Sequence, residues 1–320
     1  MTRPRILIVS PASARDNNGN WQSASRWARF LRAGFRVGIA SHWIEGDAAP
    51  DLLIALHARR SAPALAAFRA AHPDRPTLLV LTGTDVYRDI GHDAGAQASL
   101  EHAAAIVVLQ ADALTRLPDA ARARAAIIHQ SAPPLIAFAG RAPRVRDICM
   151  IGHLRPEKDP LTFMRAARLV RRSDLRLTHI GGVLDPALGQ AADAEMRTNA
   201  HYRWLGALPR GRTRQLLKRS HAMVIASLME GGANVIIEAV TCGVPVLASH
   251  IGGNVGMLGA DYAGYFAPGD SAALARLIER TGDDPAFHAL LQRQCSARAP
   301  LFAPETEQAL LRDLVDNLLR

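Results

Sequence analysis

The sequence has few cysteines and no long apolar run. Only three of its 320 residues are cysteines, widely spaced and without a CxxC pair. This excludes a disulfide framework and fits a reducing compartment. No apolar stretch of 18 residues is present, and the N-terminus enters a short apolar run without the pattern of a signal peptide. We therefore expect a cytoplasmic protein with no stable membrane association.

Lysine is also scarce, although the formal net charge is +9. Only Lys158 and Lys218 stand among the 38 basic residues, and the arginines are spread along the chain. Scattered basic charge is typical of a solvated surface, so nucleic acid is not an expected partner. Because nearly all basic residues of this chain are arginines, a lysine inside a motif is a sign of a specific role.

The histidines, cysteines and acids show no metal-ligand spacing. His57, His129 and His153 stand apart in the sequence, which favours satisfied histidines at strand ends over ligands. We expect neither a metal nor another cofactor.

What the chain does have is two series of short apolar runs, with 49% hydrophobic residues to fill two cores. Strands alternating with helices predict a parallel, doubly wound sheet, an α/β fold. The first series predicts strands at 5–10, 36–41, 52–56, 77–83 and 105–109, with helices at 21–34 and 61–72.

A stretch rich in Pro, Ala and Arg at 132–146 predicts an interdomain linker. The alternation then restarts, with strands at 147–154, 175–182, 221–227 and 244–249 and helices at 160–172, 210–220, 234–243 and 271–282. We therefore predict domains over 1–140 and 141–300 and a C-terminal helical segment over 301–320.

The segment "EGGANVIIEA" (Glu230–Ala239) lies where a predicted strand passes into a helix. A helix N-terminus presents free N–H groups and a partial positive charge, which suit an anion. Gly231 and Gly232 allow the backbone to approach a diphosphate. Carboxylates accept charge-assisted hydrogen bonds from vicinal diols, which suits a sugar near Glu230 and a ribose near Glu238.

This segment resembles the E-x7-E motif of the retaining nucleotide-sugar glycosyltransferases of family 4, which have the GT-B fold. Four further stretches resemble that family in the same order: "IGHLRPEKDPLTFMRAARLV", "YRWLGALP", "ASHIGGNVGML" and "GYFAPGDSAALARLI". The resemblance covers roughly residues 145–285. It implies two Rossmann-like domains facing a cleft, with the C-terminal helix packing back on the first domain.

The resemblance also implies roles in binding a UDP-sugar donor. Glu230 would contact the sugar, Glu238 the ribose and Lys158 the diphosphate. The family's usual arginine falls on His153, with Arg155 two residues later, so either residue could replace it. The candidate catalytic residues are thus Lys158, Glu230 and Arg155, and the candidate donor-binding residues are His153, Leu205, Gly231, Gly232, Ala233, Asn234, Val235 and Glu238.

Three polar stretches, "NNGNWQ", "LHARRSA" and "LTGTDVYRDI", follow strands of the first domain. Taken singly, each is explained by turn and cap chemistry. Taken together, they resemble one narrow group, the selenosugar synthases of selenoneine biosynthesis. The resemblance implies transfer from UDP-N-acetylglucosamine or UDP-glucose to selenophosphate. The candidate acceptor-binding residues are Asn18, Gly19, Asn20, Arg59, Arg60, Thr82, Gly83, Thr84, Asp85 and Arg88.

One departure from family 4 bears on the acceptor. Many members have His-Gly-x-Asp where this chain has Thr82-Gly83-Thr84-Asp85. A hydroxyl acceptor benefits from a group that takes its proton, whereas selenophosphate is already anionic. Three alternatives stay open: an O-glycosyltransferase with a sugar, lipid or small-molecule acceptor, a UDP-sugar 2-epimerase, and a non-catalytic nucleotide-sugar or anion-binding protein. Donor preference, anomeric outcome and oligomeric state are also open.

Overall fold

The computed structural model describes residues 3–13, 15, 19–135 and 144–320. The chain divides into two compact units, one formed by Met1–Ser131 with Ala303–Arg320 and the other by Ala132–Phe302. We call them the first and the second unit. Within the described residues, no helix is long and apolar enough to cross a bilayer.

The first unit is built on a six-stranded parallel sheet with the order β2-β1-β3-β4-β5-β6. The central strands are fully buried and apolar except for Thr77 at the start of one of them, as expected of a parallel sheet covered on both faces. The strands are β1 (Arg5–Val9), β2 (Arg36–Ala40), β3 (Leu52–Leu56), β4 (Thr77–Leu81), β5 (Ala105–Val108) and β6 (Ala125–Ile127).

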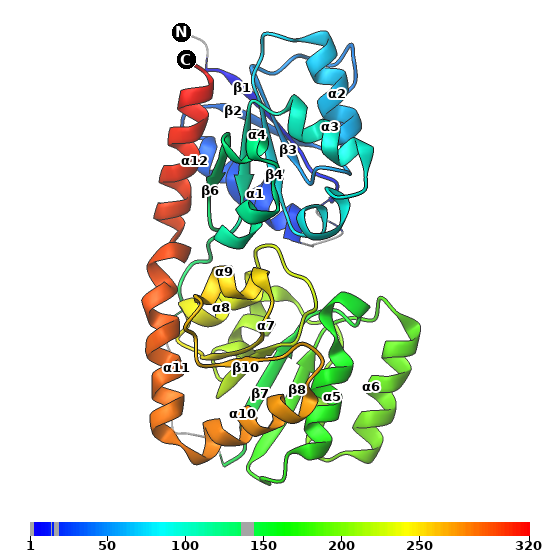
Figure 1. Cartoon of the computed structure of the whole chain (residues 1–320), viewed down its shortest axis with the longest axis vertical. Helices are drawn as coiled ribbons and strands as arrows, with labels where there is room; N and C mark the ends of the chain where they lie inside the picture. Colours follow the sequence, from blue (N-terminus) through cyan, green and yellow to red (C-terminus); the bar gives the residue numbers. More distant parts are fainter. Residues whose placement is uncertain (1–2, 14, 16–18, 136–143) are drawn as a thin grey trace. The chain divides into compact units, whose positions relative to one another are not determined.

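Helices cover both faces of this sheet (Figure 1). They are α1 (Gly19–Leu31), α2 (Ala62–Ala71), the π-helix η1 (Asp85–Asp89), α3 (Ala94–His102), the 3-10 helix η2 (Ala111–Arg116), α4 (Asp119–Arg122) and α12 (Pro304–Leu318). The amphipathic α1 packs Trp27 and Leu31 into the core, where they meet the apolar side of α12.

A buried carboxylate fastens α12 to the first unit. Glu307 is 1% exposed and accepts hydrogen bonds from Arg26 Nε and Trp27 Nε1, each at 2.7 Å, and from the amide of Ser131 at 2.8 Å. A buried carboxylate is stable only when its oxygens are satisfied in this way. The last helix is therefore part of the first unit's core.

The second unit holds a second six-stranded parallel sheet, with the order β12-β11-β10-β7-β8-β9. Counted from its own first strand, this is the Rossmann order. The strands are β7 (Arg146–Ile151), β8 (Leu175–Ile180), β9 (Tyr202–Trp204), β10 (Ala222–Ile225), β11 (Val246–Ser249) and β12 (Tyr265–Phe266).

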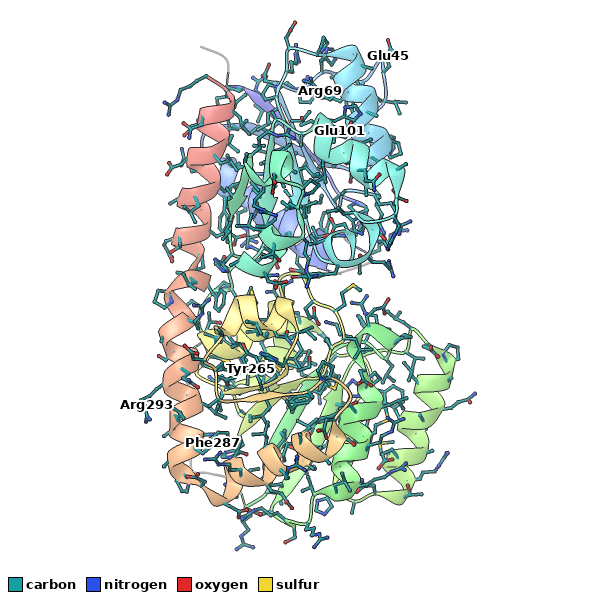
Figure 2. All side chains as sticks on the ribbon, in the orientation of Figure 1. Glu45, Arg69, Glu101, Tyr265, Phe287 and Arg293 are labelled. Atoms are coloured by element: carbon teal, nitrogen blue, oxygen red, sulfur yellow. The ribbon has the colours of Figure 1, made fainter. Side chains whose placement is uncertain are left out.

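Helices also cover the second sheet. They are η3 (Pro156–Lys158), α5 (Pro160–Leu169), α6 (Pro186–Thr198), α7 (Arg210–Leu217), α8 (Asn234–Thr241), α9 (Gly252–Leu258), α10 (Ser271–Asp283), α11 (Pro285–Arg298) and η4 (Ala299–Phe302). In α11, Phe287 is buried in the core while Arg293 points to solvent (Figure 2).

The predicted α/β architecture is confirmed, and α8 begins at the expected Asn234. The patterns did not predict the short strands β6 and β12 or the helices α3, α4, α6, α9 and α11. In each sheet the strand order reverses once, between β1 and β3 in the first and between β7 and β10 in the second. Ligands of such sheets bind beyond the carboxyl ends of the strands at these points.

Candidate functional site

An ion pair lies beyond the carboxyl ends of β7 and β10. Lys158 Nζ contacts Glu230 Oε1, and Ser227 Oγ donates to the same oxygen at 2.5 Å. The two side chains are only 15% and 10% exposed. The structure thus brings together two of the predicted catalytic residues, which stand 72 residues apart in the sequence, at the second sheet's reversal point.

Backbone contacts hold the two loops of this ion pair together. The amide of Leu228 donates to the carbonyl of Glu157 at 2.9 Å. A Cβ atom on Gly253 would lie 2.0 Å from the carbonyl oxygen of Glu230, so only glycine allows the start of α9 to approach this loop. The position of Glu230 is therefore fixed by main-chain packing as well as by Lys158.

Lys158 lies in a backbone turn that also starts the next helix. Asp159 has a left-handed φ of 43°, and its side chain caps α5 by accepting from the amide and hydroxyl of Thr162 at 3.3 and 2.5 Å. Left-handed backbone at a residue other than glycine is uncommon and concentrates at functional sites. The conformation directs the chain from Lys158 sharply into α5.

Arg155 and His153, the two candidates for the missing family arginine, differ in their contacts. Arg155 is half-buried, and its buried Nε has no hydrogen-bond partner within the described part of the chain. The exposed His153 accepts the amide proton of Gly182 on Nδ1 at 3.1 Å. Burial, Arg155 and Lys158 together lower the pKa of His153, so it is neutral at pH 7. The unpaired donor makes Arg155 the better candidate for a phosphate contact.

Glu238 lies inside α8 and is 8% exposed. Arg210 donates to its Oε1 from Nε at 3.0 Å and from Nη2 at 2.9 Å, and Arg214 Nε lies 3.7 Å from the same oxygen. The sequence did not single out these two arginines. Two signals in the sequence could have suggested the pairing: Glu238 belongs to the E-x7-E motif, and the arginine-rich helix that carries Arg210 and Arg214 precedes it closely in the chain.

The N-terminus of α8 is chemically open. Its N-cap residue, Ala233, makes no side-chain capping hydrogen bond. The first amides of a helix have no intrahelical partner, so those near Gly232–Val235 can donate to an anion. Gly231 and Gly232 lie half-buried just before it. Backbone N–H donors, Lys158 and Arg155 thus all belong to loops at the carboxyl edge of the second sheet.

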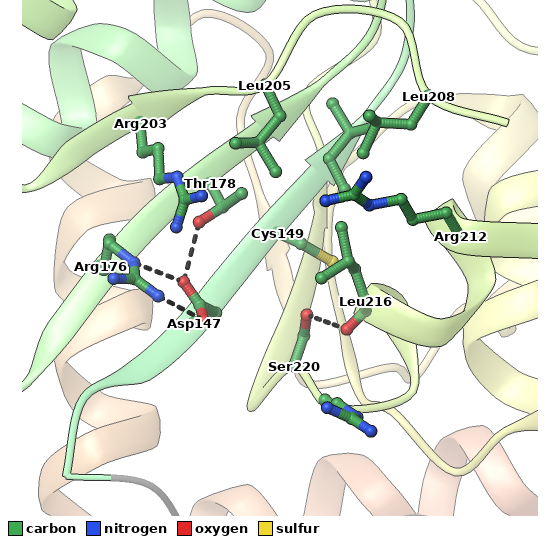
Figure 3. Close-up of a pocket in the computed structure, with 12 residues that line it drawn as sticks. Asp147, Cys149, Arg176, Thr178, Arg203, Leu205, Leu208, Arg212, Leu216 and Ser220 are labelled. Atoms are coloured by element: carbon green, nitrogen blue, oxygen red, sulfur yellow. Dashed lines mark hydrogen bonds and ion pairs between the residues drawn. The ribbon is translucent and has the colours of Figure 1, made fainter.

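A separate cavity of about 420 Å³ lies between the face of β7–β9 and α7 (Figure 3). Arg176 holds Asp147 through two hydrogen bonds of 2.8 and 2.9 Å, and Leu205 and Leu208 supply apolar wall. Of the predicted donor-binding residues, only Leu205 lines this cavity. The Leu205 amide is bonded to the carbonyl of His179 at 2.9 Å.

In the first unit, the Asp85 carboxylate turns toward the protein interior. It is fully buried, and its carboxylate accepts four backbone amides, those of Ala58, Thr82, Gly83 and Val86, at 2.7–3.1 Å. The predicted contact between Asp85 and the acceptor stays a prediction. Both its oxygens are occupied, so it positions the loops after β3 and β4.

The predicted cations beside Asp85 share another acid. Arg59 Nε donates to Asp89 Oδ2 at 2.9 Å and Arg88 Nε to Oδ1 at 3.2 Å. Burial opposes ionisation of Asp89, but these two hydrogen bonds outweigh it and lower its pKa. The exposed Arg60 has no side-chain partner among the residues described. Thr82 and Thr84 are half-buried and Gly83 is buried with φ 142°.

At the carboxyl end of β1, the exposed Gly19 starts α1, and Asn20 is half-buried beside it. Asn18 lies outside the described residues. The described residues hold no group of three or more His, Cys, Asp or Glu side chains arranged for a metal ion. The three cysteines are buried and free.

Comparison with known proteins connects the second unit to one family. A family model described as glycosyl transferases group 1 matches residues 135–300, a stretch that contains Lys158, Glu230 and Glu238. The chain belongs to this family. The match covers most of the second unit and stops short of the first unit.

Solved structures with the same fold cover nearly the whole chain. A sucrose-phosphate synthase from Thermosynechococcus elongatus has a TM-score of 0.79 at 16% identity over 99% of each chain. The Anabaena protein HepE, solved with UDP-glucose, has a TM-score of 0.78 at 14% identity over 98% of this chain and all of its own. The GT-B fold expected from the resemblance is confirmed.

Two curated relatives share more sequence over shorter stretches. A D-inositol 3-phosphate glycosyltransferase from Streptomyces avermitilis is 25% identical over 64% of this chain and 49% of its own length. An Escherichia coli galactosyltransferase that uses a diphosphoundecaprenol-linked acceptor is 25% identical over 46% of this chain and 38% of its own. The matches thus span less than half of these relatives.

Proposed function

We propose that the protein transfers a sugar from UDP-N-acetylglucosamine or UDP-glucose to selenophosphate. The C–O bond between the sugar and UDP breaks and a C–Se bond forms. Water then cleaves the Se–P bond, so that the products are a 1-selenosugar, UDP and phosphate. The Lys158–Glu230 pair at the reversal point of the second sheet is the observation that carries the donor half of this proposal.

The chemistry of this pair fits a nucleotide-sugar donor. An ion pair largely removed from water adds little to stability, because desolvation offsets the attraction. A role in ligand binding explains the position of this pair in two loops better than a role in stability does, because Lys158 and Glu230 can exchange their contact with each other for contacts with a ligand. Lys158 and the α8 amides would stabilise the charge that develops on the leaving UDP, and Glu230 would hold a sugar hydroxyl. Arg155 Nε would donate to a phosphate oxygen.

The acceptor half rests on the first unit. Three arginines, Arg59, Arg60 and Arg88, lie close in sequence to the two loops that Asp85 holds at the carboxyl edge of its sheet. The Arg60 guanidinium has no side-chain partner within the part of the chain that the structure describes. Arginine binds phosphate-like groups well because its planar fork matches their oxygens. The choice of selenophosphate as the acceptor rests on the resemblance of "LHARRSA" and "LTGTDVYRDI" to selenosugar synthases.

The proposal is tested by incubating the purified chain with each UDP-sugar and selenophosphate, then measuring UDP by coupled assay and the selenosugar by mass spectrometry. Thiophosphate and orthophosphate serve as matched anionic controls. We expect UDP and selenosugar in equal amounts, with orthophosphate inactive. Absence of UDP release with selenophosphate would remove the proposed acceptor.

An O-glycosyltransferase is the second candidate, favoured by the names of the two curated relatives, whose acceptors are an inositol phosphate and a diphosphoundecaprenol-linked sugar. Supplying D-inositol 3-phosphate or a lipid-linked N-acetylglucosamine in place of selenophosphate distinguishes the two. UDP release with a hydroxyl acceptor alone would establish this second candidate.

A further inference from the structure

His57, at the carboxyl end of β3, is held in one protonation form by its surroundings. It is 2% exposed and has a left-handed φ of 72°. The amide of Arg60 approaches Nδ1 at 3.4 Å, and the nearest carboxylate oxygen, Asp85 Oδ2, is 4.0 Å from this nitrogen. A proton on Nδ1 would therefore meet an N–H group and find no acceptor within hydrogen-bond distance among the described residues. The geometry places the imidazole proton on Nε2.

The Nε2 proton has an acceptor in Thr84. Nε2 and Thr84 Oγ1 are 3.1 Å apart, while Asp89 Oδ2 is 3.9 Å away. The Thr84 hydroxyl receives this bond and keeps its own proton for another partner. No acceptor for that proton exists among the described residues, and Thr84 does not cap η1. A half-buried hydroxyl with a free proton is suited to an anion.

We propose that His57 is a positioning residue that fixes Thr84 as a hydrogen-bond donor to a nucleophile that already carries its negative charge. The inference rests on the proposed function, and it deepens that function by naming the class of acceptor. It also gives a role to His57, which the sequence pattern indicates only as a satisfied histidine at a strand end.

Among the described residues, the groups next to His57 offer no base for a hydroxyl acceptor. His57 Nδ1 faces the Arg60 amide, Asp85 is saturated by backbone amides, and Asp89 is paired with two arginines. Burial lowers the pKa of His57, with Arg60 and Arg59 acting in the same direction against Asp85 and Asp89. The neutral imidazole therefore persists at pH 7. The cluster donates hydrogen bonds and removes no proton.

The first test reads the tautomer without any substrate. Long-range 15N–1H spectra of the 15N-histidine-labelled protein distinguish a proton on Nε2 from one on Nδ1, and loss of one signal set in His57→Gln assigns His57. We expect the Nε2–H pattern at pH 7. The Nδ1–H pattern, or a charged ring, overturns the proposal whatever the enzyme's activity.

The second test measures anion affinity, with orthophosphate and thiophosphate as probes in direct titrations. Thr84→Val and His57→Leu should each weaken binding about tenfold, because one hydrogen bond to a charged group is lost. The double variant should be no weaker than either single one, since the two residues act as a unit. Thr84→Ser and His57→Gln should restore most of the affinity. Thr115→Val is the control, because its hydroxyl binds the Asp112 carbonyl in the same unit.

Unchanged affinity in Thr84→Val, or losses that multiply in the double variant, overturn the proposal. Turnover adds a separate reading: the KM for selenophosphate should rise in Thr84→Val while the Kd for UDP stays within about twofold. A wild type that binds phosphate through Thr84 yet releases no UDP would contradict the proposed transferase function and leave the His57–Thr84 arrangement supported.

Discussion

The two units present opposite chemistry at equivalent edges of their sheets. In the second unit the carboxylate of Glu230 lies in a loop, paired with Lys158 beside the uncapped N-terminus of α8. In the first unit the carboxylate of Asp85 is fully buried and bonded to backbone amides, and cations lie outward of it. One edge can exchange its internal contacts for a ligand, whereas the other uses its acid to hold the loops that present donors.

The comparison predicts that removing Asp85 costs stability. Asp85→Ala should lower the free energy of unfolding by about 3–5 kcal/mol, because four buried amides lose a charged acceptor. Urea unfolding measures this change. The control is Asp93→Ala, which removes one capping bond to the Ala96 amide and should cost about 1 kcal/mol. Equal losses of unfolding free energy in Asp85→Ala and Asp93→Ala would contradict the structural role assigned to Asp85.

Removing Lys158 should cost activity instead. We expect Lys158→Ala to lower kcat by about 100- to 1,000-fold, since it removes a charge that stabilises the leaving group, with a smaller effect on the Kd for UDP. Steady-state UDP release and UDP titration measure the two quantities. Lys218→Ala, which changes the chain's other lysine, is the matched control. A larger effect on UDP binding than on kcat would demote Lys158 to a binding residue.

Glu238 tests the ribose assignment. Glu238→Ala should lower kcat/KM by roughly ten- to a few hundred-fold, because one or two charge-assisted hydrogen bonds of about 1.5–3 kcal/mol each are lost. Glu305→Ala, an exposed change on α12, serves as the control. Normal turnover of Glu238→Ala would contradict the ribose contact and leave Glu238 only its structural role, the pairing with Arg210.

The smallest expected effect is a loss of stability in acid that comes from the second unit. Burial lowers the pKa of His179 from 6.5 to about 4. Between these values the unfolded chain binds a proton that the native protein does not, so the free energy of unfolding falls as the pH falls. His179 should contribute a loss of about 2 kcal/mol between pH 7 and pH 5. Urea unfolding at both pH values should show a smaller loss in His179→Gln, and an equal loss would contradict the assignment.

Much of the second unit could be predicted because its signals are local. The strand–loop–helix pattern around Glu230 and Gly231–Gly232 lies in one short segment, and the isolated lysine at 158 stood out against the arginine background. The resemblance then gave the order of the other segments. The pairing of Lys158 with Glu230 depends on β7 and β10 being neighbours, which the sequence does not state.

The first unit was less predictable because its contacts depend on side-chain direction. Asp85 has the sequence signature of a site residue, yet its carboxylate turns back toward the amides of Ala58 and Gly83. The left-handed backbone of His57 has no sequence signal, because such a conformation favours glycine. Glu307 reads as a surface residue of an amphipathic helix and is buried by partners far away in the sequence.

Hydrogen–deuterium exchange of the full chain with and without UDP tests the central claim most directly, because it reports where the nucleotide binds. The account predicts slower exchange at 152–158 and 228–238 with saturating UDP, and unchanged exchange at 57–60 and 82–89. Protection of the first-unit loops without protection at 152–158 and 228–238 would contradict it.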